Sequence, residues 1–526
     1  MDNQKTAQDS GQALIHALCD AGAYLHQTAS IQLIETHISW VFLTGQYAYK
    51  IKKPVNFGFL DFSTLEKRQF YCHEELRLNQ RLAASWYLEV VPITGSPDQP
   101  KIGGAGVAIE YAVKMRQFPS AQTLREAAES GCLDADIIDQ VTDIIADFHK
   151  TSAKTDGLSP FGESQEINYW FTENFDGIRP FLDETTQLQL LEAIQSWGAD
   201  EFNYKTQLMQ QRKQQGFIRE CHGDLHLGNI TVIDGRAVLF DCIEFNPMLR
   251  WIDVMSEVAF LTVDLLRFGY ADYAYRFLNR YLQATGDYQG LAVFRYYLVY
   301  RALVRAKIGL LRLNQNPDAS VSLQIRSEYA LFANLAGRFT QNSSMVLIIT
   351  HGFSGSGKST FASQLAEKIG ALQIRSDLER KRLFGYSAQA NTNSAFGHGV
   401  YTQEASQQTY QHLAGLAKVV LEAGFSAIID ATFLKTEQRG GFRQLASDCH
   451  VPILIIDFQA SDETLCKRIR QRQQDASEAT VAVLKLQQQS AQPLSEEEQN
   501  ASITVDTEGL NILETLLSRL KAMSVY

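Results

Sequence analysis

Cysteine is scarce in this chain, and its pattern excludes two classes of site. The 526 residues include seven cysteines, an odd number, and no two of them form a C-x-x-C pair. Disulfide frameworks and structural zinc sites need cysteines that are paired or clustered at short spacings. We therefore expect neither, and we expect Cys221 and Cys242 to behave as small buried hydrophobic residues.

Long apolar runs and an excess of positive charge are also lacking. No stretch approaches the ~18–20 apolar residues of a membrane span, and the opening MDNQKTAQDS contains no apolar signal region. The net charge of −11 argues against a broad nucleic-acid or membrane-binding surface, although it is compatible with a local basic groove. We expect a cytoplasmic protein of about three lobes or domains, because one core rarely serves a chain of this length.

What the sequence does contain is a phosphate-binding motif, HGFSGSGKST, from residue 351 to residue 360. It matches G-x-x-x-x-G-K-[ST] and lies between the β-branched run Met345–Thr350 and the helix-forming run Phe361–Lys368. In this strand–loop–helix context, backbone N–H groups cradle phosphates, the lysine reaches the outer phosphates and the serine hydroxyl binds Mg²⁺. A plain glycine-rich turn is the alternative. The predicted ATP-binding residues are Gly352, Ser354, Gly355, Ser356, Gly357, Lys358, Ser359 and Thr360, with Ser359 also a Mg²⁺ ligand.

The chain divides at a short polar tract, residues 341–344. Before the tract, Phe294–Phe339 has a helical, amphipathic pattern. After it, apolar runs alternate with helical segments, which indicates a parallel sheet with right-handed crossovers. The predicted domains are residues 1–342 and 343–526. The predicted strands of the second domain are Met345–Thr350, Leu372–Arg375, Ser426–Asp430 and Ile453–Phe458.

The first domain has a mixed pattern. Ile38–Leu43 and Tyr47–Ile51 are separated by a tight turn and predict a β-hairpin. Phe62–Ala83 predicts a helix, and from Asp134 onward the pattern is mainly helical. The exception is a short strand-rich region at Ile230–Phe240.

A second set of chemical groups lies in that region, in CHGDLHLGNI (residues 221–230). His222, Asp224 and Asn229 have the H-x-D-x-x-x-x-N spacing of a kinase catalytic loop, and Asp241 follows at the end of an apolar strand. Phosphoryl transfer needs one carboxylate to accept the hydroxyl proton, and an amide oxygen and a second carboxylate to hold Mg²⁺. We predict Asp224 as the base and Asn229 and Asp241 as metal ligands. A turn or helix cap is the alternative for Asp224.

Lys50 stands at the end of a predicted strand in the A-x-K form of a lysine that grips the α- and β-phosphates. Its predicted partner is Glu75, with Glu74 as the alternative, and ordinary surface positions are the other reading of Lys50 and Glu75. Phe245–Leu266 is apolar and predicts a helix after Pro247. We expect a core helix there with Trp251 packed inside, although Arg250 and Asp253 could instead support the metal loop.

These residues resemble the aminoglycoside phosphotransferase and choline kinase superfamily, whose signature HGDLHxxN is followed by a metal-binding aspartate. The resemblance covers roughly Ser30–Thr340 and implies a two-lobed, protein-kinase-like α+β fold. Two departures from protein kinases keep a pseudokinase role open. The turn Glu35–His37 has no glycine, and Asp241 is followed by Cys242-Ile243 rather than Phe-Gly.

The second domain carries three further groups. Asp377 and Arg380 form S-D-x-x-R after the second strand, where an aspartate typically takes the acceptor proton and an arginine holds an anionic part of the acceptor. A helix cap by Ser376 or Asp377 is the other reading. Asp430 ends the third strand and is predicted to serve Mg²⁺ or the acceptor. Arg468 and Arg472 share a helix face and are predicted to stabilise the γ-phosphate from a lid, against a solvated basic face.

Over about Met345–Leu520 the chain resembles P-loop kinases such as gluconate kinase, the zeta toxins and polynucleotide 5′-kinases, an α/β fold with a mostly parallel sheet. The whole chain resembles bacterial bifunctional aminoglycoside phosphotransferase/ATP-binding proteins. The resemblance implies two sites that use ATP and Mg²⁺ to phosphorylate a hydroxyl group. A small molecule is the expected acceptor, and the 5′ ends of nucleic acid are a less favoured one. The alternative is an ATP-binding regulatory or partner-binding protein in which only the P-loop domain is catalytic.

Overall fold

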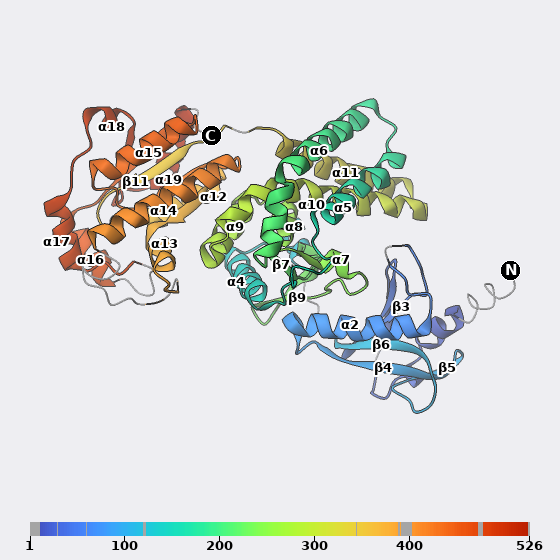
Figure 1. Ribbon diagram of the computed structural model, residues 1–526. Helices are drawn as coiled ribbons and strands as arrows, with labels where there is room; N and C mark the ends of the chain where they lie inside the picture. Colours follow the sequence, from blue (N-terminus) through green and yellow to red (C-terminus); the bar gives the residue numbers. More distant parts are fainter. Residues whose placement is uncertain are drawn as a thin grey trace. The chain divides into compact units, whose positions relative to one another are not determined.

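The computed structural model of the chain describes residues 11–28, 30–58, 60–118, 123–342, 344–387, 390, 402–471 and 477–523. The chain forms two compact units (Figure 1). The first comprises Met1–Val141, Thr151–Gly162 and Lys213–Glu257, and the second comprises Thr142–Lys150, Glu163–Arg212 and Val258–Tyr526. These units do not follow the predicted division after residue 342, which stays a prediction.

The first unit contains an antiparallel sheet in the order β1-β2-β3-β6-β4-β5. The predicted hairpin is confirmed as β2 and β3. Successive side chains of a strand point to opposite faces, so Tyr49 and Ile51 enter one apolar cluster and Ala48 enters another with Cys72. The strands are β1 (Gln32–Glu35), β2 (Ser39–Leu43), β3 (Tyr47–Lys52), β4 (Tyr87–Ser96), β5 (Gln99–Ile102) and β6 (Ala108–Arg116), and a short 3₁₀ helix, η1 (Ala21–Ala23), precedes them.

Helix α2 (Leu65–Ala83) packs on the face of the sheet that carries Ala48. It begins three residues after the predicted start because Thr64 caps it, accepting a hydrogen bond from the Lys67 N–H at 3.3 Å. Its nineteen residues contain neither glycine nor proline, so nothing interrupts the helix. The buried side of α2 includes Glu75 and Asn79 as well as apolar groups.

The strand-rich region of the first unit forms the antiparallel hairpin β8–β9. The Phe240 N–H donates to the Asn229 carbonyl at 3.0 Å, so the two ends of the hairpin lie together. The region comprises β7 (Ile218–Glu220), η3 (Leu227–Asn229), β8 (Ile230–Ile233), β9 (Arg236–Leu239), α7 (Pro247–Arg250) and β10 (Trp251–Asp253), and α3 (Leu124–Glu129) also belongs to this unit.

The prediction of one helix after Pro247 is wrong in part. Helix α7 ends after four residues, because Trp251–Asp253 form β10 and pair with β7; α8 (Val254–Arg267) begins only after that. Trp251 is half-buried and stacks on Phe161 with ring centroids 5.5 Å apart. Pairing with β7 therefore overrides the local helical pattern.

The second unit contains a helical part and a parallel sheet. In the helical part α10 is largely buried and packs against α11 and α5. Tyr296 of α10 stacks on Phe171 of α5 with centroids 4.6 Å apart. The helices are α4 (Ala135–Thr151) and α8, each shared with the first unit, α5 (Ser164–Ile178), η2 (Arg179–Phe181), α6 (Thr185–Gln214), α9 (Ala271–Thr285), η4 (Tyr288–Gly290), α10 (Leu291–Leu311), η5 (Arg312–Gln315) and α11 (Ala319–Thr340).

The sheet of the second unit has the order β12-β13-β11-β14-β15, and all its strands are parallel. The four predicted strands are confirmed, and a fifth, β15, was not predicted. The strands are β11 (Leu347–His351), β12 (Leu372–Arg375), β13 (Ala427–Asp430), β14 (Ile453–Gln459) and β15 (Ser502–Asp506). The helices are α12 (Lys358–Ile369), α13 (Ser376–Leu383), α14 (Gln403–Glu422), α15 (Thr436–Asp448), α16 (Asp462–Gln471), α17 (Val481–Ser490), α18 (Glu496–Asn500) and α19 (Ile512–Ala522).

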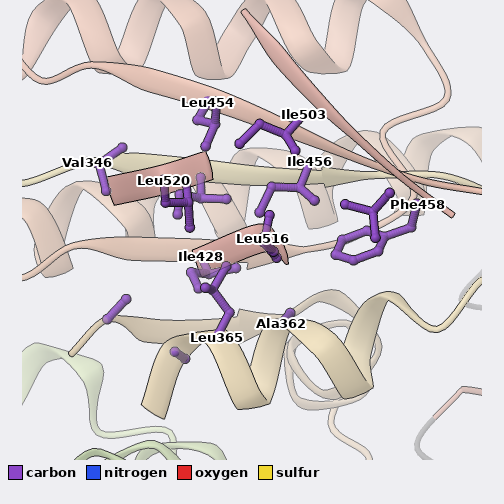
Figure 2. Packing of buried hydrophobic residues seen from close by; sticks show 14 residues of the cluster. Val346, Ala362, Leu365, Ile428, Leu454, Ile456, Phe458, Ile503, Leu516 and Leu520 are labelled. Carbon is purple, nitrogen blue, oxygen red and sulfur yellow. The ribbon is translucent and has the colours of Figure 1, made fainter. Parts of the chain in front are cut away.

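An apolar cluster joins this sheet to α12 and α19 (Figure 2). Leu365 of α12 and Leu516 of α19 pack with the strand residues Ile428 and Ile456, and all four side chains are almost fully buried. Parallel strands are covered on both faces and are therefore apolar throughout. The predicted α+β kinase-like part and the α/β P-loop part are both present. Among the described residues, no helix is long and apolar enough to cross a membrane.

Candidate functional sites

The phosphate-binding motif forms the loop between β11 and α12, as predicted. Gly352 has φ of +134° and Gly357 has φ of +83°, conformations that side chains disfavour. A Cβ on Gly352 would stand 2.4 Å from the carbonyl oxygen of Phe458, so only glycine fits there. Lys358 is the first residue of α12, and its Nζ donates to the Phe353 carbonyl at 2.7 Å. The lysine side chain thus lies over the loop, where it would contact the phosphates of a bound nucleotide.

Hydrogen bonds fasten this loop to the end of β13. The Thr350 hydroxyl donates to the Ala431 carbonyl at 2.6 Å, and the Gly352 N–H donates to the Thr432 carbonyl at 3.2 Å. Asp430, the last residue of β13, is therefore held beside the loop. Ligands gather at the carboxyl ends of strands in such sheets because the loops there open onto one edge.

Asp430 is buried, and the environment of its carboxyl group is polar. Burial raises the pKa of Asp430, while Arg375 and hydrogen bonding with Ser359 act in the opposite direction. The amide Nε2 of Gln373 donates to Asp430 Oδ2 at 3.1 Å. A carboxylate and a hydroxyl oxygen are the donors that Mg²⁺ prefers. The Ser359–Asp430 pair therefore fits the predicted metal.

The loop opens into a cavity of about 270 Å³ that brings the predicted residues of this site together. Asp377 and Arg380, one turn apart on α13, line it with Lys358, Ser359 and Asp430. Asp377 is half-buried and Arg380 is 8% exposed. The cavity therefore offers a carboxylate, a guanidinium and a phosphate-binding loop to one bound molecule.

Sequence reasoning missed several groups that also line this cavity, namely Lys435, Gln438 and Gln487. Gln487 is bonded directly to the loop: its Oε1 accepts from the Ser354 N–H at 3.0 Å and its Nε2 donates to the Ser354 hydroxyl at 3.0 Å. Glu478 also lines the cavity and pairs with Lys381 at 3.2 Å. These groups come from α15 and its N-cap residue Lys435, from α17 and from the segment before α17, and no motif spacing marked them.

Of the two arginines predicted to act from a lid, the structure describes Arg468 and does not describe Arg472. The Arg468 guanidinium donates to the Thr507 hydroxyl and the Thr507 carbonyl, both at 2.9 Å, and reaches the Gly355 carbonyl at 3.4 Å. It therefore braces the back of the phosphate-binding loop, and its role at the γ-phosphate stays a prediction. Arg472 lies outside the described residues.

In the first unit, Lys50 lies between its predicted partner, Glu75, and the predicted metal ligand Asp241. Its Nζ is 2.8 Å from Glu75 Oε1 and 2.6 Å from Asp241 Oδ1. Burial alone would lower the pKa of Lys50, but the carboxylates of Asp241, Glu75 and Glu244 raise it well above its ordinary value. The lysine is thus held as a cation. Glu74, the alternative partner, instead contacts Arg77 at 2.9 Å and Arg250 at 3.3 Å.

A second lysine on the same face of β3, Lys52, was not predicted. It is fully buried and pairs with Glu75 Oε2 at 2.7 Å and with Glu244. Residues i and i+2 of a strand share a face, so the spacing of Lys50 and Lys52 was a usable signal. Because both lysines bind Glu75, this one carboxylate of α2 holds two cations of β3.

The catalytic-loop residues are also close together. The Asn229 Nδ2 donates to the Asp224 carbonyl at 3.0 Å and to Asp224 Oδ2 at 3.1 Å. His222 donates from Nε2 to the Phe240 carbonyl at 2.9 Å, which ties the loop to the end of β9. His226 Nε2 lies 3.4 Å from Asp224 Oδ2. The loop is thus fixed on both sides of Asp224.

The first unit also has donors that fit a divalent cation. Asn229 supplies an amide oxygen, since its NH₂ group is engaged with Asp224. The Asp241 side chain is 44% exposed, so it remains accessible while one oxygen binds Lys50. Arg250, considered above as a support, donates to the Glu244 carbonyl at 3.1 Å and pairs with Glu220 at 3.1 Å. It therefore anchors the segment that follows Asp241.

Comparison with known proteins gives relatives for both halves. Residues 347–494 match the AAA domain family. The uncharacterized protein Rv2004c of Mycobacterium tuberculosis is 30% identical over 453 residues, which are 86% of this chain and 88% of that protein. The uncharacterized protein Mb2027c of Mycobacterium bovis matches to the same extent.

Solved structures are similar at lower identity. A choline/ethanolamine kinase family protein from Mesorhizobium loti is 11% identical and covers 62% of this chain and 99% of its own, with a TM-score of 0.35. A gluconokinase from Sinorhizobium meliloti 1021 is 17% identical and covers 34% of this chain and 93% of its own, with a TM-score of 0.25.

Proposed function

The chain belongs to one family with these mycobacterial proteins, and we propose that it is an ATP-dependent phosphotransferase with two sites. Each site would transfer the γ-phosphoryl group of ATP to a hydroxyl group of an acceptor. A small molecule is the proposed acceptor, and the 5′-hydroxyl end of a nucleic acid is the less favoured one. The observation that carries the proposal is the cavity of the second unit, which is lined by Lys358, Asp430, Asp377 and Arg380 together.

In the second unit, the backbone N–H groups of the loop and the Lys358 ammonium would bind the phosphates of ATP. The Asp377 carboxylate would accept the proton of the attacking hydroxyl, and Arg380 would orient an anionic part of the acceptor. Ser359 and Asp430 would hold Mg²⁺, which when bound neutralises charge on the phosphate oxygens.

In the first unit, Lys50 would contact the α- and β-phosphates while Glu75 holds it in place at 2.8 Å. The Asp224 carboxylate would accept the acceptor proton, and Asn229 orients that carboxylate through the 3.1 Å bond. Asn229 and Asp241 would be the ligands of Mg²⁺ at this site. All five residues lie in one unit.

The test uses the full chain with γ-labelled ATP and a bacterial extract separated into metabolites, RNA and protein. Lys358→Ala and Asp224→Ala disable one site each, and Lys418→Ala and Asp200→Ala are controls at exposed helical positions. If a site is active, we expect the variant that disables it to label one fraction about 10²–10³-fold less than the unmodified chain does. If both variants label every fraction as the unmodified chain does, the proposal is wrong.

A second function is supported by one observation in the first unit. The turn between β1 and β2, where a protein kinase has its glycine-rich loop, is closed on itself. The Thr36 N–H and hydroxyl both donate to the Ser39 carbonyl, at 2.9 and 3.0 Å, and the Ser39 N–H donates to the Thr36 hydroxyl. Backbone donors that would cover ATP are thus used within the turn. This favours a regulatory, ATP-binding first unit, with catalysis in the P-loop part alone.

The two functions differ in one measurable way. If the first unit is regulatory, Asp224→Ala will leave phosphoryl transfer within about twofold of the unmodified chain, whereas Lys358→Ala will abolish it. If both sites are catalytic, each variant will remove transfer to its own acceptor and leave the other intact.

A further inference from the structure

Strand β12 lies at the edge of the parallel sheet, and helix α9 covers that edge. An edge strand presents backbone N–H and C=O groups without a neighbouring strand. Here the Asn279 side chain of α9 takes the place of a strand: its Oδ1 accepts from the Gln373 N–H at 2.7 Å and its Nδ2 donates to the Ala371 carbonyl at 3.0 Å. The Tyr288 hydroxyl of η4 donates to the Gln373 carbonyl at 3.5 Å.

The side chain of Gln373 connects this edge to the P-loop site. Its amide oxygen accepts from the Ser363 hydroxyl at 2.8 Å and from Gln283 Nε2 at 3.3 Å. Its amide NH₂ group is thereby turned toward Asp430 and donates to Oδ2 at 3.1 Å. The side chain is 1% exposed, so water does not compete for these bonds.

We infer that Gln373 is a positioning residue that orients the Asp430 carboxylate, and that α9 and η4 are structural parts of the P-loop site because they hold Gln373. The inference rests on the proposed function of that site. Both ends of the Gln373 amide and both of its backbone polar groups have partners, so the residue has one orientation. Gln373 passes that orientation to Asp430 through the 3.1 Å N–H bond, while Arg375 Nε lies farther from the same oxygen, at 3.7 Å. Supporting groups of this kind govern how well a carboxylate presents its oxygen to a metal ion.

The contact with the nucleotide loop itself is weak. Gln373 Nε2 reaches the Ser359 carbonyl only at 3.5 Å. Removing the amide should therefore change metal-dependent binding of ATP and leave metal-independent binding almost unchanged. This separation distinguishes a positioning role from general damage to the loop.

The experiment measures the dissociation constant of ATP at the P-loop site of the full chain, once with Mg²⁺ and once with EDTA. Every variant, and the unmodified chain with which it is compared, carries Lys50→Ala so that the first site does not contribute. Gln373→Met keeps the length of the side chain and removes the amide. We expect the strengthening of ATP binding by Mg²⁺ to fall about tenfold or more, while binding in EDTA stays within about twofold. The matched control is Gln444→Met, since Gln444 also donates to a carboxylate, Asp448 at 2.8 Å, but on the exposed face of α15.

Asn279→Leu is the second variant and lies outside the P-loop part of the chain. It keeps the size of the side chain but releases the backbone of Gln373, so we expect a loss of the same kind and of smaller size. If Gln373→Met does not fold, Asn279→Leu still tests whether Gln373 positions Asp430. A full Mg²⁺ effect in both variants, or the absence of any Mg²⁺ effect in the unmodified chain, would overturn the inference. The proposed function of the P-loop site fails separately, if Lys358→Ala in the same Lys50→Ala background leaves ATP binding unchanged.

Discussion

Lys50 and Asp241 are 191 residues apart in the chain, and the lysine Nζ lies 2.6 Å from the aspartate Oδ1. The first belongs to β3 and the second follows β9, at φ of +66°. The same lysine contacts Glu75 of α2. This three-membered contact joins the antiparallel sheet of the first unit to its catalytic-loop residues, and it is where loss of one charge should have the clearest effect.

Lys50→Ala should weaken ATP binding at the first site by about 10–100-fold, because a buried charge-assisted contact to phosphate is lost. The measurement is made in the Lys358→Ala background, so that the second site does not contribute. Lys53→Ala is the matched control, since Lys53 pairs with Glu35, whose side chain is 62% exposed. Equal ATP affinity in the two variants would contradict the assignment of Lys50.

Glu75→Gln should destabilise the protein in a pH-dependent way. Burial raises the pKa of Glu75, but the ammonium groups of Lys50 and Lys52 outweigh it and hold the pKa at about 2, below the ordinary 4.5. A lowered carboxyl pKa stabilises the folded state above about pH 4.5, and this stabilisation is lost as the pH falls toward 2. The variant should therefore cost about 3 kcal/mol near neutral pH.

Urea unfolding of the unmodified chain and the variant, at neutral pH and at about pH 3, provides the check. The difference in unfolding free energy between them should shrink in acid. Glu129→Gln is the control, because Glu129 pairs with Arg125 at the surface, where its side chain is 48% exposed. A difference that is constant across this range would show that the two lysines do not stabilise the Glu75 carboxylate.

Gly352→Ala should abolish ATP binding at the second site. The new Cβ would stand 2.4 Å from the Phe458 carbonyl oxygen, at a φ of +134° that alanine disfavours. The loop must move, and the phosphate-binding N–H groups move with it. We expect the dissociation constant of ATP to rise by more than about tenfold.

Gly440→Ala is the matched control for this change. Gly440 lies within α15, and a Cβ there would meet nothing within 4 Å. Alanine should therefore be tolerated and should stabilise the helix by about 1 kcal/mol. An ATP affinity that Gly352→Ala leaves unchanged would show that the loop does not bind phosphate in this conformation.

Leu516→Ala should destabilise the second unit by about 2–5 kcal/mol, because it leaves a cavity between α19 and the sheet (Figure 2). Leu510→Ala removes the same atoms from a side chain that is 92% exposed and should change stability by less than about 0.5 kcal/mol. Denaturant unfolding of both variants measures the difference. Similar losses in the two would mean that α19 does not contribute to this core.

Much of the fold could be predicted because its elements are strong local patterns. The run Met345–Thr350 is apolar because a central parallel strand is buried on both faces, and it forms β11 as predicted. The edge strand β15 was missed because its sequence, SITVD, alternates buried and exposed residues and has no continuous apolar run. The interruption of the helix by β10 was missed because its cause, pairing with β7, lies about 30 residues away.

In the candidate sites too, residues in local motifs could be predicted and residues brought in by packing could not. Motif spacing marked Lys358, Asp224, Asn229 and Asp241 as candidates, because the chemistry fixes which residue types stand a few positions apart. Lys435 and Gln487 have no such spacing, since they reach their cavity from helices that lie far along the chain from the loop. Nothing local marks a lysine or glutamine as facing a loop 80 or more residues away.

The sequence alone determined the chemical parts of this protein: a phosphate-binding loop, a catalytic-loop motif and their strand and helix context. Those parts are local, because a few consecutive residues set a turn, a cap or a buried strand. Only the tertiary structure decided which groups act on one another, namely that Glu75 serves two lysines and that Asn279 of α9 completes the edge of β12. Such contacts depend on how separate elements pack, and packing is a property of the whole folded chain.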